Sequence, residues 1–123
     1  MSKKSIAITI NCHKPFIRHL DDEHVSKNTA LFQAISDTYL PLLNMFADLE
    51  AEGIPFKINM SISPTLCEML ADPVLQQQYI EWLDKLISLG NDEVAKYSND
   101  TPKRLLAVEC LNKTVQNKRA KKF

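Results

Sequence analysis

The chain has 123 residues, of which 45% are hydrophobic and 24% charged, a composition typical of one soluble globular domain and not of a disordered segment. Fifteen lysines and arginines balance fifteen aspartates and glutamates, so the zero net charge excludes the strong field of a general polyanion-binding protein. No apolar run approaches the roughly 18 residues of a membrane span, no signal-type segment is recognised, and the cysteines form no CxxC pair. We therefore expect a cytoplasmic protein without a disulfide framework or a zinc knuckle.

The first predicted element is a β-strand that starts at Ile6. Branched residues alternate with small or polar ones along IAITIN, which is the period of a pleated strand. Pro15 lacks a backbone donor and disfavours helical geometry in the residue before it, so the strand should stop at about Cys12 or His13. The carboxyl end of this strand then carries Asn11, Cys12 and His13.

A long helix is expected next, from about residue 30 to Gly53. Its apolar residues recur at three- and four-residue steps and form one stripe: Leu31, Ile35, Tyr39, Leu42, Leu43, Phe46 and Leu49. Ser26, Asn28 and Thr29 are candidate caps for its start. Pro41 interrupts the stripe and predicts a kink near residues 37–39 or two helices in tandem. Gly53 stands where a left-handed helix terminus favours glycine.

A second strand is predicted over residues 56–63, where large apolar residues again alternate with small polar ones and a proline follows. A strand, a helix and another strand form a βαβ unit, in which the strands are parallel and the crossover right-handed. One face of each strand is small and hydrophilic, which favours a closed barrel with an internal ligand site over an open doubly wound sheet.

Three further helices are predicted downstream. Ser63 and Asp72 each stand before a proline, which combines an N-cap with proline at the first helical position, and a last helix begins at about Thr101. The middle helix should end near Gly90. Residues 113–123 are basic and poor in apolar side chains, so we expect a solvated, frayed tail there. The predicted fold class is α/β, with two parallel strands and four to five helices.

Three blocks of the sequence resemble a known family. INCHKPFIRH, LFQAISDTYLPLL and GIPFKINMSISPTLCEMLADP are similar, in this order, to the amino-terminal end of glycoside hydrolase family 57, especially the α-1,4-glucan branching enzyme type. The resemblance implies a retaining, α-glucan-active enzyme on a (β/α)7 barrel, of which residues 1–123 form a single partial domain containing the first two strands. The family's glutamate nucleophile and aspartate general acid lie downstream, so the resemblance implies no catalytic residue in this chain and no activity of the chain alone.

The resemblance also implies two substrate-binding residues. The family's first motif, two histidines separated by one residue and followed by an apolar residue and proline, lines the glucosyl subsite next to the cleaved bond. His13 and Pro15 match the second histidine and the proline, whereas Asn11 replaces the first histidine and Lys14 the apolar residue. Asparagine can bind a sugar hydroxyl but lacks the proton chemistry of imidazole. A divergent homologue, a non-catalytic relative and a truncated reading frame all remain open.

Other reactive residues have plainer explanations. The histidines and acidic residues of segment 19–24 match no metal-ligand spacing, so we expect a solvated loop, no metal site and no cofactor. Cys12 and His13 are adjacent, and neighbouring strand residues point to opposite faces, which makes a nucleophilic pair geometrically poor. Tyr39, Phe46 and Trp82 lie on helical apolar stripes, which favours core packing over sugar stacking.

Two functions follow from these observations. The first is the sugar-binding, amino-terminal part of an α-glucan-active hydrolase or branching enzyme, present as a fragment or a truncated homologue. The alternative is a non-catalytic α/β interaction module, because a two-stranded sheet has exposed edges that a homo-oligomer or another partner would cover. Neither function involves nucleic acid or a membrane.

Overall fold

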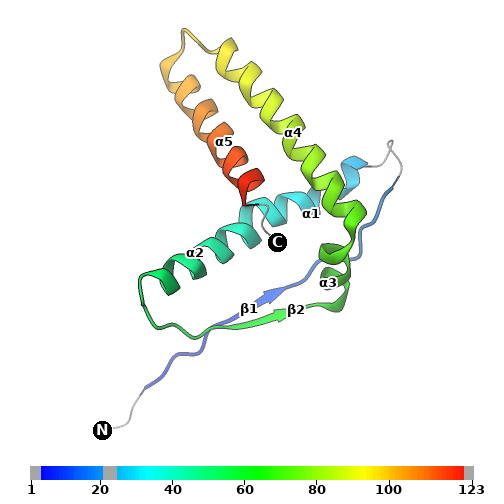
Figure 1. The fold of residues 1–123 in the computed structure, drawn as a ribbon, viewed down its shortest axis with the longest axis vertical. Helices are drawn as coiled ribbons and strands as arrows, with labels where there is room; N and C mark the ends of the chain where they lie inside the picture. The colour runs from blue at the N-terminus through cyan, green and yellow to red at the C-terminus, as the bar shows by residue number, and fades with distance from the viewer. Residues whose placement is uncertain (1–3, 21–24, 121–123) are drawn as a thin grey trace.

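The computed structural model describes residues 4–20 and 25–120. A two-stranded sheet lies beneath a long bent helix, formed by residues 29–51, and a helical hairpin, formed by residues 73–119, extends from the other side of that helix (Figure 1). The sheet consists of β1 (Thr9–Cys12) and β2 (Asn59–Ile62). The helices are α1 (Thr29–Ala34), α2 (Leu40–Ala51), α3 (Pro64–Ala71), α4 (Pro73–Lys96) and α5 (Thr101–Arg119), with a 3-10 turn η1 (Val25–Asn28) and a π-helical turn η2 (Ile35–Tyr39).

The two strands are parallel, which confirms the predicted α/β class and its βαβ unit. In the register Thr9 pairs with Asn59 and Asn11 with Ser61, and β1 ends at Cys12 as predicted. Both strands are shorter than predicted. Residues 6–8 precede the paired segment, and Ile6 there is 92% exposed, so no packing against the helices extends the strand in that direction.

The predicted irregularity before Pro41 is the π-helical turn η2. Its widened ring is closed by the Leu40 N–H, which donates to the carbonyl of Ile35. The next bond of this kind would join residue 41 to the carbonyl of Ser36, but proline has no N–H to donate. The side-chain amide of Asn117 on α5 donates to that carbonyl instead, at 3.3 Å. The proline is therefore accommodated by a wider turn and a side chain from another helix.

The helix ends are set by the predicted residues at three positions. Ser63 Oγ accepts from the Leu66 N–H at the start of α3, and an Asp72 carboxylate oxygen accepts from the Val74 N–H at 2.8 Å at the start of α4. Gly53 has a φ of 68° just after α2, in the left-handed region where glycine is favoured. Local sequence thus determines these three boundaries.

Two predictions near the carboxyl end differ from the structure. α4 does not end near Gly90 but continues to Lys96. Gly90 lies within the helix and against α5, where a Cβ at this position would lie 3.0 Å from Leu111 Cδ1. α5 continues as helix to Arg119, through most of the segment predicted to fray. Its lysines pair with acidic residues on other helices: Lys113 Nζ lies 3.2 Å from Asp37, and Lys118 pairs with Asp84. Residues 121–123 lie outside the described part of the chain.

The hydrophobic core lies between the bent helix, β1, α3 and the first half of α4. Its buried members are Cys12, Leu31, Phe32, Leu40, Leu66, Met69, Leu75, Tyr79 and Leu83. The rings of Phe32 and Tyr79 have centroids 5.7 Å apart, and the Phe32 and Trp82 centroids are also 5.7 Å apart. Among the helices that the structure describes, none is long and apolar enough to cross a membrane.

Candidate functional site

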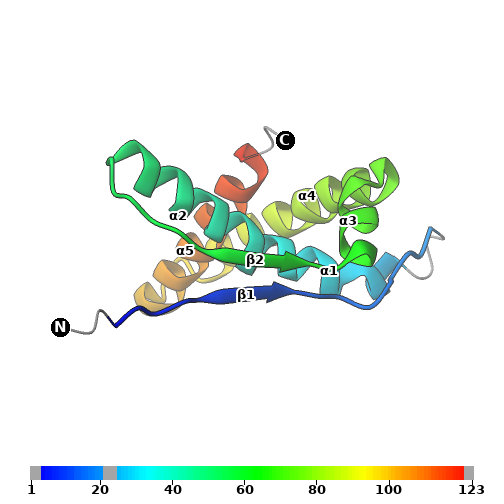
Figure 2. The same cartoon turned by 90° about the horizontal axis from the view of Figure 1, so that it is seen from below.

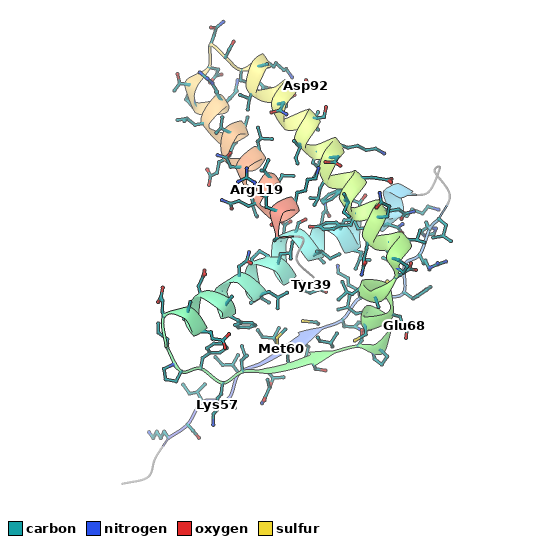
Figure 3. All side chains as sticks on the ribbon, viewed as in Figure 1. Tyr39, Lys57, Met60, Glu68, Asp92 and Arg119 are labelled. Carbon is teal, nitrogen blue, oxygen red and sulfur yellow. The ribbon has the colours of Figure 1, made fainter. Side chains whose placement is uncertain are left out.

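The helices lie on one side of the sheet and leave its other face uncovered (Figure 2). Cys12 is buried in the core and Ile10 packs against it, so the even-numbered residues of β1 face the helices. In Figure 3, Met60 points from β2 toward the helices, whereas Lys57 points the other way. The uncovered face consequently carries the odd-numbered side chains of the paired segments, which are all polar, uncharged and exposed: Thr9, Asn11, Asn59 and Ser61.

Asn11 and His13, the two predicted sugar-binding residues, both lie at the carboxyl end of β1. Asn11 is on the uncovered face, one position before the strand ends, and His13 is the first residue of the loop that follows. Both side chains are exposed, and no hydrogen bond joins them within the described residues. Cys12 between them is buried in the core, whereas His13 is exposed, so the thiol and the imidazole lie in different environments.

The backbone on either side of His13 is held by the start of α3. The Ser63 N–H donates to the Cys12 carbonyl at 3.0 Å, and the Thr65 hydroxyl donates to the Lys14 carbonyl at 3.2 Å. These bonds fix the loop where it leaves the sheet. The position of His13 is therefore determined by the junction between β2 and α3 as well as by β1.

Further along, the same loop is attached to α3 and α4. The Ile17 N–H donates to Met69 Sδ at 3.1 Å, and Arg18 forms an ion pair with Asp72 at 2.5 Å. The hydrogen bond from Arg18 lowers the pKa of the Asp72 carboxyl below its usual value, and the backbone N–H of Val74 contributes in the same direction. The loop after β1 is thus anchored along its described length.

Asn28, a candidate helix cap from the sequence, instead links the loop after β1 to α4. Its side chain makes no cap bond and is completely buried. Its amide accepts from the His19 N–H at 3.1 Å and donates to the His19 carbonyl and to Gln78 Oε1, both at 2.7 Å. Nothing in the local sequence distinguishes this role from capping, because the partners come from the loop and from α4.

The remaining reactive residues contribute packing. Trp82 lies in the aromatic cluster with Phe32 and Tyr79, and Phe46 stacks on Phe56 with ring centroids 5.3 Å apart. Tyr39 packs against the core, and burial, with a smaller effect of Cys12, raises the pKa of its hydroxyl. No three His, Cys, Asp or Glu residues of the described segments are placed to hold a metal ion. The predicted loop residues 21–24 lie outside those segments.

A separate cavity of about 370 Å³ opens between the bent helix and α3, α4 and α5. Its lining is mainly aliphatic and aromatic, with Gln76, Asn117 and Lys118 as its polar members besides two tyrosines. None of the side chains of the uncovered sheet face lines it. The cavity is therefore distinct from the candidate site.

Comparison with known proteins gives two informative matches. No family model matches the chain. A 1,4-α-glucan branching enzyme from Thermococcus kodakarensis is 26% identical over 92 residues, which cover 75% of this chain and 14% of that protein. The crystal structure of an α-amylase, AmyC, from Thermotoga maritima superposes with a TM-score of 0.82 at 34% identity, over 92% of this chain and 21% of that one. The chain thus spans less than a quarter of the length of either relative. Both matches confirm the resemblance predicted from the sequence: the chain is similar to a fragment of a glycoside hydrolase family 57 protein.

Proposed function

We propose that residues 1–123 form one partial domain that contributes a sugar-binding wall to an α-glucan-active protein, with His13 and Asn11 contacting a glucosyl unit. The observation that carries this proposal is the position of both side chains, exposed at the carboxyl end of β1 beside an uncharged polar sheet face. Carboxyl ends of parallel strands are where barrel folds bind their ligands. The names of the two relatives, a branching enzyme for 1,4-α-glucan and an α-amylase, support an α-glucan as the ligand.

The chemistry of this face suits binding and not bond cleavage. Asparagine and neutral histidine both donate and accept hydrogen bonds, as sugar hydroxyls do. Glycoside hydrolysis requires a pair of carboxyl groups about 5 to 9 Å apart across the scissile bond. The four side chains of the uncovered face are all uncharged. Residues 1–123 alone should therefore bind a glucan without hydrolysing or transferring it.

The test is a titration of residues 1–123 with maltoheptaose, followed by ¹H–¹⁵N correlation spectra. The expected result is a saturable shift of the Asn11 side-chain amide and the His13 backbone amide, with no release of reducing ends from amylose. Loss of one hydrogen bond is worth about 0.5 to 1.5 kcal/mol, so His13→Ala or Asn11→Ala should weaken binding about 2- to 12-fold. Asn44→Ala, at an exposed position of α2, is the matched control. Absence of any shift, or release of reducing ends, would contradict the proposal.

A second candidate function is supported by the edges of the sheet. Within the described chain neither outer edge is paired, and Met60 and Ile62 on the helix side of β2 remain 40% and 47% exposed. Such edges favour strand addition by another polypeptide. An interaction module of this kind would form a homo-oligomer, which sedimentation over a range of concentrations would detect; a monomer at every concentration contradicts it.

A further inference from the structure

We infer that Ser61 on β2 is a sugar-binding residue that acts together with Asn11 on β1, so that one side chain from each strand binds neighbouring hydroxyls of the same glucosyl unit. This inference rests on the proposed function, because it assumes that the uncovered face receives a glucan. It adds a residue from the second strand, which lies outside the histidine motif.

The strand register places these two side chains next to each other. Asn11 is paired with Ser61, and each is the next-to-last residue of its strand. Paired strands lie about 4.8 Å apart, and residues paired in a parallel ladder share one face. Both side chains are exposed on the face that the helices leave uncovered. They therefore stand side by side at the carboxyl end of the sheet.

The chemistry of the pair suits a neutral diol. An asparagine amide offers both donors and an acceptor, and a serine hydroxyl offers one donor and acceptor lone pairs. The next pair down the sheet, Thr9 and Asn59, is also uncharged, so a neutral ligand meets no ionic group on this paired segment. Adjacent hydroxyls of a pyranose can then bind to one side chain each, without the desolvation of a charge.

The neighbouring serine provides an internal contrast. Ser63 Oγ accepts from the Leu66 N–H as the cap of α3 and lies 3.2 Å from Thr65 Oγ1, so its hydrogen-bonding capacity is used inside the protein. The Ser61 hydroxyl has no such internal partner among the described residues. Of the two serines at the end of β2, only Ser61 is available to a ligand.

The experiment compares Ser61→Ala, Asn11→Ala and the double variant of residues 1–123 in titrations with maltoheptaose. Each single variant should weaken binding about 2- to 12-fold. The double variant should weaken binding less than the product of the two single effects, because both side chains hold one glucosyl unit and lose it together. Ser88→Ala, an exposed serine on α4, is the matched control and should leave the affinity unchanged.

The possible outcomes separate this inference from the function on which it rests. If the unmodified chain binds no maltoheptaose, the proposed function fails and the inference fails with it. If the unmodified chain binds and Asn11→Ala weakens binding, but Ser61→Ala behaves like Ser88→Ala, the inference alone is overturned. If both single variants weaken binding and their effects multiply in the double variant, the two side chains do not share one glucosyl unit, which also overturns it.

Discussion

Gly90→Ala should have two opposing effects on the free energy of unfolding, one from helix propensity and one from the contact between α4 and α5. Alanine in a helix interior is more favourable than glycine by about 1 kcal/mol. The added Cβ would lie 3.0 Å from Leu111 Cδ1 and 3.4 Å from Leu111 Cβ, whereas ordinary carbon contacts are about 3.5 to 4.0 Å. Leu111 must therefore move by a few tenths of an ångström, and an off-rotamer side chain costs about 0.5 to 1.5 kcal/mol. The two effects should nearly cancel.

The size of the contact effect can be isolated with a second substitution. In a Leu111→Ala background the Cδ1 methyl group of Leu111 is absent, so the added Cβ makes no close contact with it. Gly90→Ala should then raise the free energy of unfolding by about 1 kcal/mol. In the unmodified chain the gain should stay below about 0.5 kcal/mol, by the difference between propensity and strain. Urea unfolding followed by far-ultraviolet circular dichroism measures both values. Ser88→Ala, on the exposed side of the same helix, should give equal gains in both backgrounds. Equal gains for Gly90→Ala would refute the close-contact role.

Two further predictions concern the core and the loop after β1. Phe32→Ala should lower the free energy of unfolding by about 3 to 5 kcal/mol, because the Phe32 ring is completely buried and packs on two other aromatic rings. Phe16 is exposed, so Phe16→Ala should change the free energy of unfolding by less than about 1 kcal/mol. Similar losses for the two variants would contradict the core assignment. The lowered pKa of Asp72 means that its ion pair with Arg18 stabilises the fold above the usual pKa of an aspartate and ceases to do so as the pH falls through the lowered value. Asp72→Asn, which keeps a capping oxygen, should therefore lose less stability than the unmodified chain when urea unfolding is compared between neutral and strongly acidic pH; equal losses would contradict this linkage.

The features predicted correctly from the sequence are those determined by neighbouring residues. Pro15 limits β1, Pro41 enforces an irregular turn, and Gly53 ends α2 because each acts on the backbone beside it. The parallel pairing followed from the βαβ rule and needed no knowledge of side-chain contacts.

The features that the sequence did not reveal depend on contacts between distant segments. Gly90 has the residue type of a helix terminus, and only its distance to Leu111 shows that it serves helix packing. Residues 113–119 are helical, and Lys113 and Lys118 in this segment pair with acidic residues on other helices, contacts that local composition does not reveal.

The candidate site shows the same division. Asn11 and His13 could be placed at a strand end from alternation and the following proline alone. Ser61 could be recognised as a neighbour of Asn11 only after the register of β1 against β2 was known, since a shift by one residue would turn its side chain to the other face.

The bond from Asn117 to the Ser36 carbonyl couples two positions that lie far apart in the chain. Ser36 is buried, so removing the amide while Pro41 remains would leave a carbonyl inside the protein without a donor. If Pro41 is first replaced by a residue with a backbone N–H, that N–H can donate to the Ser36 carbonyl, and the side-chain amide of Asn117 is no longer needed there. The order in which these two substitutions occur therefore decides whether the intermediate sequence is stable, and homologues should show Asn117 together with Pro41 more often than either residue alone.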